Sequence, residues 1–317
     1  MKLEQEVINA ATRINAYIRK TPFPISPYFS ALLDGEVFFK LENQQVTGSF
    51  KARGALNKVL SLSKIEQERG VVSASTGNHG AAVAYASNEV NIKCSIYVPS
   101  GSSDTKISKM RDYGAKIIVY GSDCVEAEAE ARRVSDSNGL TYISPYNDLK
   151  VMTGQGTLGY EITSQYSELD AIIISLGGGG LLSGTASYLK SVWPGVKVIA
   201  CSPENSAVMI QSIDAGKILN LDSLPTLSDG TAGGVENDSI TFPICSGLID
   251  EAVLLTEEEI KKAMMLYMEH ENQILEGAAG TAVAALLKKQ VELKGKRVAV
   301  VICGGNISLD TLRKVIN

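Results

Sequence analysis

The sequence has few of the residues that build metal centres and disulfide frameworks. Its 317 residues include only two histidines and five cysteines, and no pair of cysteines has the C-x-x-C spacing. We therefore expect neither a multi-histidine metal site nor zinc-module or thioredoxin-like chemistry. The cysteine count is odd, and the first residues, MKLEQEVINA, lack the apolar core of a secretory signal. Free thiols in the reducing cytoplasm are the expectation.

Charge of one sign and long hydrophobic runs are also scarce. Lysines and arginines number 30 against 35 acidic residues, a net charge of −5, so nothing favours a nucleic-acid partner or an anionic membrane. No apolar run approaches the roughly 20 residues of a membrane-spanning helix. The strings AIIISL (171–176) and VAVVIC (298–303) end at glycines instead, which is typical of buried strands in a parallel sheet.

What the sequence does contain is a regular alternation of apolar and helical segments. The apolar segments lie at 36–41, 70–75, 93–99, 116–120, 141–145, 171–176, 196–201, 251–255 and 297–303. This alternation predicts an α/β fold, with parallel or mixed sheets and helices on both faces. Thr256 and Glu259 are spaced as a capping box, which marks one helix start. Because parallel sheets bind ligands at the carboxyl ends of their strands, the segments after the strands are the candidates for chemistry.

The first of these segments is SASTGNHG (73–80), which follows the second predicted strand. It gathers hydroxyls, glycines, an amide and an imidazole in one strand-to-helix turn. Side chains and backbone N–H groups of such a turn can meet a bound anion. The alternative is a plain helix start in which Asn78 is the N-cap.

The second segment, SLGGGGLLSG (175–184), holds four consecutive glycines after a predicted strand. Consecutive N–H groups that lead into a helix form a phosphate nest. The segment is not a dinucleotide fingerprint, because Leu182 or Ser183 stands at the last required glycine. It is not a P-loop either, because Thr185 follows Gly184 where a lysine is required. A phosphate site without a nucleotide signature remains, against the alternative of a flexible loop.

A third segment, VICGGNISLD (301–310), follows the last predicted strand, and alone it indicates only a tight turn. Lys51 stands in TGSFKARGA (47–55). If Ser49 opens a helix, Lys51 lies at the positive end of the helix dipole, an unfavourable place for a structural ammonium. That place suits an amine whose pKa is depressed or that is consumed in an imine. A phosphate nest, such a lysine and an asparagine turn are the parts of a pyridoxal phosphate site.

The motifs GSFKARGA, STGNHG, GQGT, GGGGLLSG and CGGN, in this order, resemble those of the fold type II (beta family) pyridoxal-phosphate enzymes. More narrowly, the chain resembles the threonine/serine dehydratase and serine racemase group over nearly its whole length. The resemblance implies a tryptophan synthase beta-like fold, with a large cofactor-binding domain at 1–69 and 149–317 and a small domain at 70–148. It also implies pyridoxal 5'-phosphate as cofactor, a small amino acid as substrate, and a homodimer or homotetramer.

The resemblance assigns roles to particular residues. Lys51 is expected to form an imine with the cofactor and to remove the α proton of the substrate. Asn78 is expected at the ring hydroxyl, Cys303 opposite the pyridine nitrogen and Glu276 near the ring. The expected phosphate ligands are Gly177, Gly178, Gly179, Gly180 and Leu181. The expected substrate-binding turn comprises Ser75, Thr76, Gly77, Asn78 and His79, and Ser75 and Thr76 are also expected to take part in catalysis.

The implied activity is β-elimination, which deaminates L-threonine, L-serine or a related 3-hydroxy amino acid to a 2-keto acid and ammonia. Three alternatives stay open: a serine racemase-type isomerase, a cysteine synthase-like β-replacement enzyme, and a non-catalytic nucleotide-binding protein of Rossmann type. Racemases of this group use a serine directly before Gly-Asn-His as a second base. Thr76 stands at that position here, so racemisation is the less favoured reaction.

Two further features of such relatives are only partly present. Many hold a divalent cation after the strand predicted at 196–201. Glu204 could supply one ligand there, but no second carboxylate occurs within 208–213, so no metal is assigned. Relatives that act on hydroxyaspartate have an arginine in the helix after the fourth predicted strand, where this chain has alanine or, with a shifted alignment, Arg132 or Arg133.

Overall fold

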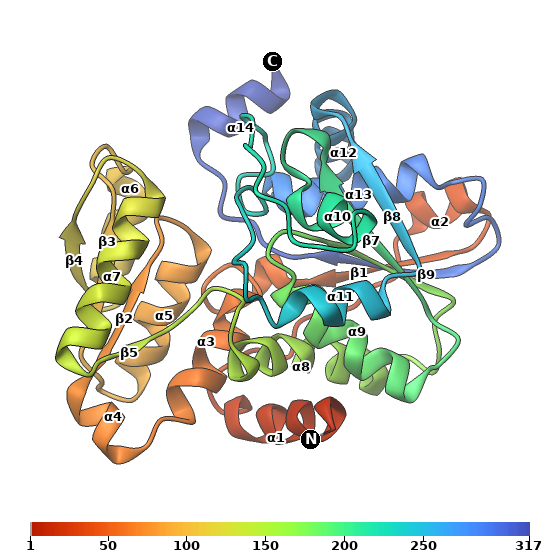
Figure 1. The fold of residues 1–317 in the computed structure, drawn as a ribbon. Helices are drawn as coiled ribbons and strands as arrows, with labels where there is room; N and C mark the ends of the chain where they lie inside the picture. Colours follow the sequence, from red (N-terminus) through yellow and green to blue (C-terminus); the bar gives the residue numbers. More distant parts are fainter. Residues whose placement is uncertain (1) are drawn as a thin grey trace.

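The computed structural model describes residues 2–317, apart from the side chains of residues 105 and 106. Within these residues, the strands form two sheets (Figure 1). The strands are β1 (Glu36–Leu41), β2 (Val71–Ala74), β3 (Cys94–Val98), β4 (Lys116–Val119), β5 (Thr141–Tyr142), β6 (Ala171–Ser175), β7 (Lys197–Pro203), β8 (Glu251–Leu255) and β9 (Arg297–Ile302). A five-stranded sheet has the order β1-β9-β6-β7-β8, and a four-stranded sheet has the order β4-β3-β2-β5. All neighbouring strands in both sheets are parallel.

Helices surround both sheets (Figure 1). The α-helices are α1 (Leu3–Ile14), α2 (Pro27–Leu33), α3 (Lys51–Leu60), α4 (Lys64–Arg69), α5 (Asn78–Glu89), α6 (Asp104–Asp112), α7 (Cys124–Asn138), α8 (Leu149–Gln165), α9 (Gly180–Val192), α10 (Val208–Asp214), α11 (Thr241–Leu248), α12 (Glu257–Glu271), α13 (Gly277–Lys288) and α14 (Leu309–Ile316). Two short 3-10 helices are η1 (Glu42–Gln44) and η2 (Glu204–Ser206).

The five-stranded sheet is buried on both faces. Its central strand β6 is fully apolar at Ile172, Ile173 and Ile174, all buried, as expected for a parallel sheet covered on two sides. Helix α13 packs along β6 and β9, and α8 and α9 lie on the opposite side of the sheet (Figure 1).

The four-stranded sheet is covered by apolar side chains on both faces. Successive residues of its strand β2 point to opposite faces. Val71 belongs to the apolar cluster that includes Ala82 of α5 and Met110 of α6. Its neighbour Val72 belongs to a separate cluster with Ala127 of α7. Successive side chains of β2 therefore anchor helices on opposite faces of the sheet.

Helix α3 joins the two halves of the molecule, because it packs against both α5 and α8. Leu56 and Val59 of α3 lie in the same apolar cluster as α5. Toward α8 the contact is backbone to backbone: a Cβ at Gly154 would lie 2.7 Å from the Cα of Gly54. The first turn of α3 is thereby held at the boundary between the sheets.

The α/β fold predicted from the sequence is confirmed, and each predicted apolar segment overlaps a strand. The segment at 141–145 forms only Thr141–Tyr142. The capping box of Thr256 and Glu259 is also confirmed. The domain boundaries near residues 70 and 148 stay a prediction, and the four strands of the smaller sheet lie between them. Among the described residues, no helix combines the length and apolarity that crossing a membrane requires.

Candidate active site

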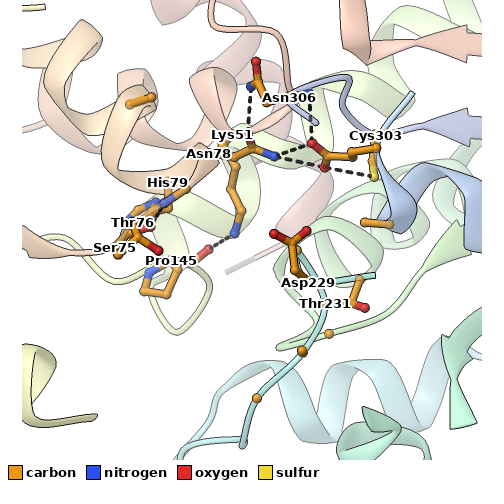
Figure 2. Close-up of a pocket in the computed structure, with 18 of the residues that line it drawn as sticks. Lys51, Ser75, Thr76, Asn78, His79, Pro145, Asp229, Thr231, Cys303 and Asn306 are labelled. Carbon is orange, nitrogen blue, oxygen red and sulfur yellow. Dashed lines mark hydrogen bonds between the residues drawn. The ribbon is translucent and has the colours of Figure 1, made fainter. Parts of the chain in front are cut away.

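A cavity of about 850 Å³ lies where segments from both sheets meet (Figure 2). Its lining comes from the turn after β2, the glycine segment after β6, the residues after β9 and the first turn of α3. These are carboxyl ends of parallel strands, where the fold class places ligands. Every residue to which the resemblance assigned a role lies in this lining. The individual roles stay predictions.

Lys51 is the first residue of α3, close to the helix start expected at Ser49. The preceding turn is attached to the end of β9 by an antiparallel bridge between Ser49 and Gly304. Gly48 takes a φ of 77° in this turn, a left-handed conformation that glycine adopts without strain. The turn directs the Lys51 side chain into the cavity, where Nζ donates to the Pro145 carbonyl at 2.9 Å (Figure 2).

The Lys51 amine thus donates its hydrogen bond to a carbonyl oxygen and not to a carboxylate. Burial lowers the pKa of this amine from 10.5 to about 8, although Cys303 and Glu276 act in the opposite direction. A lysine with a pKa near 8 is partly unprotonated close to neutral pH. It can therefore attack an aldehyde or accept a proton, which an ordinary surface lysine does poorly.

The glycine segment 177–180 has no room for side chains. Gly179 is left-handed with a φ of 85°, and a Cβ at Gly178 would lie 2.4 Å from the Tyr146 ring. The segment opens α9, a helix of 13 residues. The N–H groups of its first turn have no acceptor within the helix, and the helix dipole favours an anion there.

Asn78 is the first residue of α5, whose N-cap is Gly77. The alternative that Asn78 itself is the N-cap is therefore wrong. Its side chain instead points across the cavity, where Nδ2 donates to both carboxylate oxygens of Glu276 at 2.9 Å (Figure 2). Its Oδ1 accepts a hydrogen bond of 2.7 Å from Nδ2 of Asn306. Both faces of the Asn78 amide are thus engaged by segments of the larger sheet.

Cys303 directly follows β9 and is buried. Its Sγ lies 4.0 Å from Oε1 of Glu276. Burial, followed by the neighbouring Glu276 and Cys201, raises the pKa of the Cys303 thiol well above its ordinary value. The side chain is therefore a neutral thiol at physiological pH, as expected for a neutral partner of a pyridine nitrogen.

The turn 75–78 forms one rim of the cavity, and its side chains Ser75 and Thr76 are half-buried. The Gly77 N–H donates to Oγ of Ser75 at 3.2 Å. The His79 ring nitrogen Nε2 lies 2.9 Å from the Ile143 carbonyl, and burial lowers the pKa of His79 to about 3. His79 is thus a neutral imidazole whose Nε2 contacts the backbone.

Several lining residues were missed by sequence reasoning. Asp229 and Thr231 belong to the loop SDGTAGG (228–234), whose glycines are a detectable signal. Figure 2 shows the Asp229 carboxylate directed into the cavity. Tyr146, which covers the glycine segment, and Lys109 of α6 carry no local signal that marks them as functional.

Neither candidate arginine for a second substrate carboxylate lines the cavity. Arg132 forms ion pairs with Glu128 at 2.7 Å and Glu236 at 3.0 Å. Arg133 is exposed and pairs with Glu130 at 2.7 Å. Both guanidinium groups are therefore held by carboxylates of the protein itself.

The position after β7 where many such relatives hold a divalent cation, to which no metal was assigned, receives no support from the geometry. Glu204 is exposed in η2. Among the described residues, no group of three or more histidine, cysteine, aspartate or glutamate side chains is placed to hold a metal ion.

The cavity fits pyridoxal phosphate on its own features. An aldehyde can react with the Lys51 amine, whose pKa is lowered to about 8. A phosphate can bind at the helix start at Gly179–Gly180. A side chain at either glycine would collide with Tyr146 or with Thr241. A pyridine ring can contact the amide of Asn78 and the thiol of Cys303, which both line the cavity.

Fold and cavity together define an α/β enzyme whose site is assembled around a buried lysine amine. A family model described as pyridoxal-phosphate dependent enzyme matches residues 14–304, and the chain belongs to this family. The resemblance and the cofactor prediction are thereby confirmed. The alternative of a nucleotide-binding protein without catalysis is wrong.

Similar proteins include both lyases and racemases. The L-threonine ammonia-lyase of Thermotoga maritima is 39% identical, with 99% of this chain and 78% of the relative covered. The serine racemase of Dictyostelium discoideum is 38% identical, with 99% of this chain and 97% of the relative covered. The solved structure of maize serine racemase matches with a TM-score of 0.93 at 31% identity, covering 99% of this chain and 96% of that chain.

Proposed function

We propose that the protein is an ammonia-lyase that deaminates L-threonine, L-serine or a related 3-hydroxy amino acid by β-elimination. The products are the corresponding 2-keto acid and ammonia. Support comes from the similarity to L-threonine ammonia-lyase over nearly the whole chain. It also comes from the presence in one cavity of a reactive amine, an anion-binding helix start and a polar turn.

The observation that carries the proposal is the state of Lys51. Its amine projects into the cavity, donates to the Pro145 carbonyl, and has a pKa lowered to about 8 by burial. An amine in this state can bind the cofactor aldehyde covalently. After it is released by an incoming amino group, it can accept the α proton of the substrate.

The bound pyridoxal phosphate supplies an electron sink that makes the α C–H bond of an amino acid acidic. The protein groups supply placement. The first turn of α9, with Gly180 and Leu181, holds the phosphate by backbone N–H groups. Asn78 and Cys303 would hold the ring as neutral groups, because the amide is uncharged and burial keeps the thiol protonated.

The turn 75–77 is the proposed site of the substrate carboxylate, since it lines the cavity directly before α5, and the N–H groups of the first turn of a helix have no acceptor within the helix. With the carboxylate held there, Lys51 takes the α proton and the β hydroxyl leaves as water once protonated. The released aminoacrylate product then takes up water and loses ammonia, which balances the overall deamination.

The test is direct. The purified holoenzyme, incubated with L-threonine and L-serine, is expected to release 2-oxobutanoate and pyruvate with one equivalent of ammonia each. Lys51→Ala is expected to lose this activity together with the visible absorption of covalently bound cofactor. A wild-type protein that turns over neither substrate, or a Lys51→Ala variant that keeps both properties, contradicts the proposal.

Racemisation of serine is a second candidate, because Thr76 retains a hydroxyl at the edge of the cavity. Its extra methyl group makes it a more hindered base than the serine that the resemblance implies for racemases of this group. The decisive measurement is pyruvate and D-serine from the same L-serine incubation. Accumulation of D-serine faster than pyruvate would reverse the assignment. Cysteine formation from O-acetylserine and sulfide tests the β-replacement alternative in the same way.

We also propose that the enzyme acts in the cytoplasm as a homodimer or homotetramer. Cys94, Cys201, Cys245 and Cys303 are buried free thiols, which suits a reducing compartment. Sedimentation of the holoenzyme measures the oligomeric state, and a sedimenting monomer would contradict this part of the proposal.

A further inference from the structure

Lys109 reaches the cavity from α6, on the side of the smaller sheet, and no role has been assigned to it. Its Nζ donates to Oδ1 of Asn306 at 2.8 Å and to the Thr47 carbonyl at 3.1 Å. Asn306 follows β9, and Thr47 lies in the turn before Lys51. One ammonium therefore ties α6 to two segments of the larger sheet. Burial lowers the pKa of Lys109, with Glu276 acting against it.

The hydrogen bonds that continue from Lys109 have a fixed direction. An ammonium only donates, so Asn306 must turn Oδ1 toward it and Nδ2 away from it. Nδ2 of Asn306 then donates to the Thr47 carbonyl at 2.9 Å and to Oδ1 of Asn78 at 2.7 Å. Asn78 must in consequence turn its own Nδ2 toward Glu276, which accepts at 2.9 Å.

The chain of hydrogen bonds thus runs from a cation to a carboxylate through two amides. An amide side chain alone has two nearly isosteric orientations, which exchange donor and acceptor. Here Lys109 and the Thr47 carbonyl select one orientation of Asn306, and Glu276 selects the matching orientation of Asn78. If Asn306 flipped, its oxygen would face the Thr47 carbonyl, and Asn78 would have to present its oxygen to Glu276.

We propose that Lys109 is a positioning residue: through Asn306 it fixes the orientation of the Asn78 amide beside the bound cofactor. This inference rests on the proposed function, in which Asn78 holds the cofactor ring. It adds a residue from α6 to the machinery of the site. Lys109 is not a catalytic residue, because its contacts are with Asn306 and Thr47.

The test compares three holoenzyme variants with one control. Lys109→Met removes the ammonium but keeps the apolar stem, and Lys109→Arg keeps a donor-only cation. Asn306→Asp is isosteric and still accepts from Lys109, but it cannot donate to Asn78. The control is Lys116→Met, an exposed lysine on β4 of the same sheet. Each is measured for kcat, KM, thermal midpoint and the visible spectrum of the bound cofactor as a function of pH.

For Lys109→Met we expect kcat to fall on the order of tenfold, the size of one hydrogen bond to a charged group. KM should change much less, and the pH midpoint of the cofactor spectrum should shift, because Asn306 then holds the amide beside the ring less firmly. Lys109→Arg should recover most of both properties. Asn306→Asp should show the larger loss and the same spectral shift. A purely structural role would lower the thermal midpoint without moving the spectrum.

Lys109→Met with the kcat and the spectral midpoint of Lys116→Met overturns the inference. If Lys109→Met does not fold, Asn306→Asp decides: a shifted spectrum supports the inference and an unchanged spectrum overturns it. A wild-type protein without the cofactor band, or with a band that survives Lys51→Ala, overturns the proposed function itself and the inference with it. The two failures are therefore distinguishable.

Discussion

Helix α3 carries two buried cations two residues apart, and their surroundings are opposite. Arg53 is fully buried in an ion cluster formed by Lys40, Glu42, Arg53 and Glu161. Its guanidinium lies 2.7 Å from Glu42 and 2.7 Å from Glu161, and Nζ of Lys40 lies 2.7 Å from the same Glu161. Lys51, at the start of the helix, faces the cavity and donates to the Pro145 carbonyl.

The pKa shifts of the two cations have opposite signs for this reason. Burial disfavours the charged form of both. At Arg53, Glu42 and Glu161 outweigh burial, and the pKa of the guanidinium is raised above its ordinary value. At Lys51 burial dominates and the pKa falls to about 8. For these two cations of α3, the difference in sign comes from the carboxylates of Glu42 and Glu161, which lie at hydrogen-bonding distance from Arg53.

The comparison separates stability from chemistry. The ion cluster contains two cations and two carboxylates, so its charges balance, and it fastens α3 to η1 and α8 through Glu42 and Glu161. A balanced cluster holds a helix in place but leaves no group available to a ligand. The cluster around Arg53 thereby fixes the position of Lys51, two residues away. The Lys51 amine donates to a carbonyl instead of a carboxylate and remains reactive.

The largest expected effect is on the reactive side of this comparison. Lys51→Ala should lower turnover of the proposed substrates on the order of 10⁴-fold, the upper range for a lost acid–base group. The thermal midpoint of the cofactor-free protein should be unchanged or higher, because a poorly solvated ammonium has been removed. Keto-acid release and calorimetry measure the two effects. Loss of folding together with activity would show that Lys51 is structural.

The reverse pattern is expected for Arg53→Met. Removing the guanidinium leaves two carboxylates buried beside one lysine, and breaking such a buried pair costs about 3–5 kcal/mol of folding free energy. Urea unfolding of the cofactor-free protein measures the loss. Arg133→Met is the matched control, since its ion pair with Glu130 is on the surface and its loss should leave stability almost unchanged. Equal losses in the two variants would contradict the difference.

The sequence indicated the reactive Lys51 but gave no sign of the ion cluster around Arg53. Lys51, Asn78 and the glycine segment 177–180 stand in short motifs after strands, where residue type and strand position together indicate a ligand site. The strands themselves were predictable because strands of a parallel sheet are buried on both faces and therefore consist of continuous apolar runs.

The ion cluster and the Lys109 contacts were not predictable, because they join distant parts of the chain. Arg53 and Glu161 are 108 positions apart, and Lys109 and Asn306 are 197 positions apart. In a single sequence a charged residue is expected at the surface, since such residues are seldom fully buried unless paired. Only the packing of α3 against α8, and of α6 near the end of β9, reveals their partners.

An intermediate effect is expected on the pH dependence of stability. In the cofactor-free protein the pKa of Lys51 is about 8, below its ordinary value of 10.5. Between these values the unfolded chain binds more protons than the folded one, so this group makes stability rise with pH. Lys51→Met should therefore be more stable than the wild type near pH 7, by a margin that shrinks toward about pH 10.

Urea unfolding of both proteins at several pH values gives this difference, from which the titrations common to both, such as that of Lys40, cancel. A margin independent of pH would mean that the Lys51 amine is not shifted.

The smallest expected effect concerns Cys303, the neutral group of the cavity. Serine is also neutral at this position, so Cys303→Ser should keep cofactor binding and elimination within about threefold, less than 1 kcal/mol in the barrier.

Cys303→Asp differs, because it introduces an acid beside Glu276, at 4.0 Å from the present Sγ. Two carboxyls this close share a proton, which leaves an acidic hydrogen facing the ring. The ratio of amino-form cofactor to keto acid per turnover should then rise. If Cys303→Asp folds, binds cofactor and leaves that ratio as in the wild type, the thiol does not influence the reaction course, and Cys303 is a packing residue like the other buried cysteines.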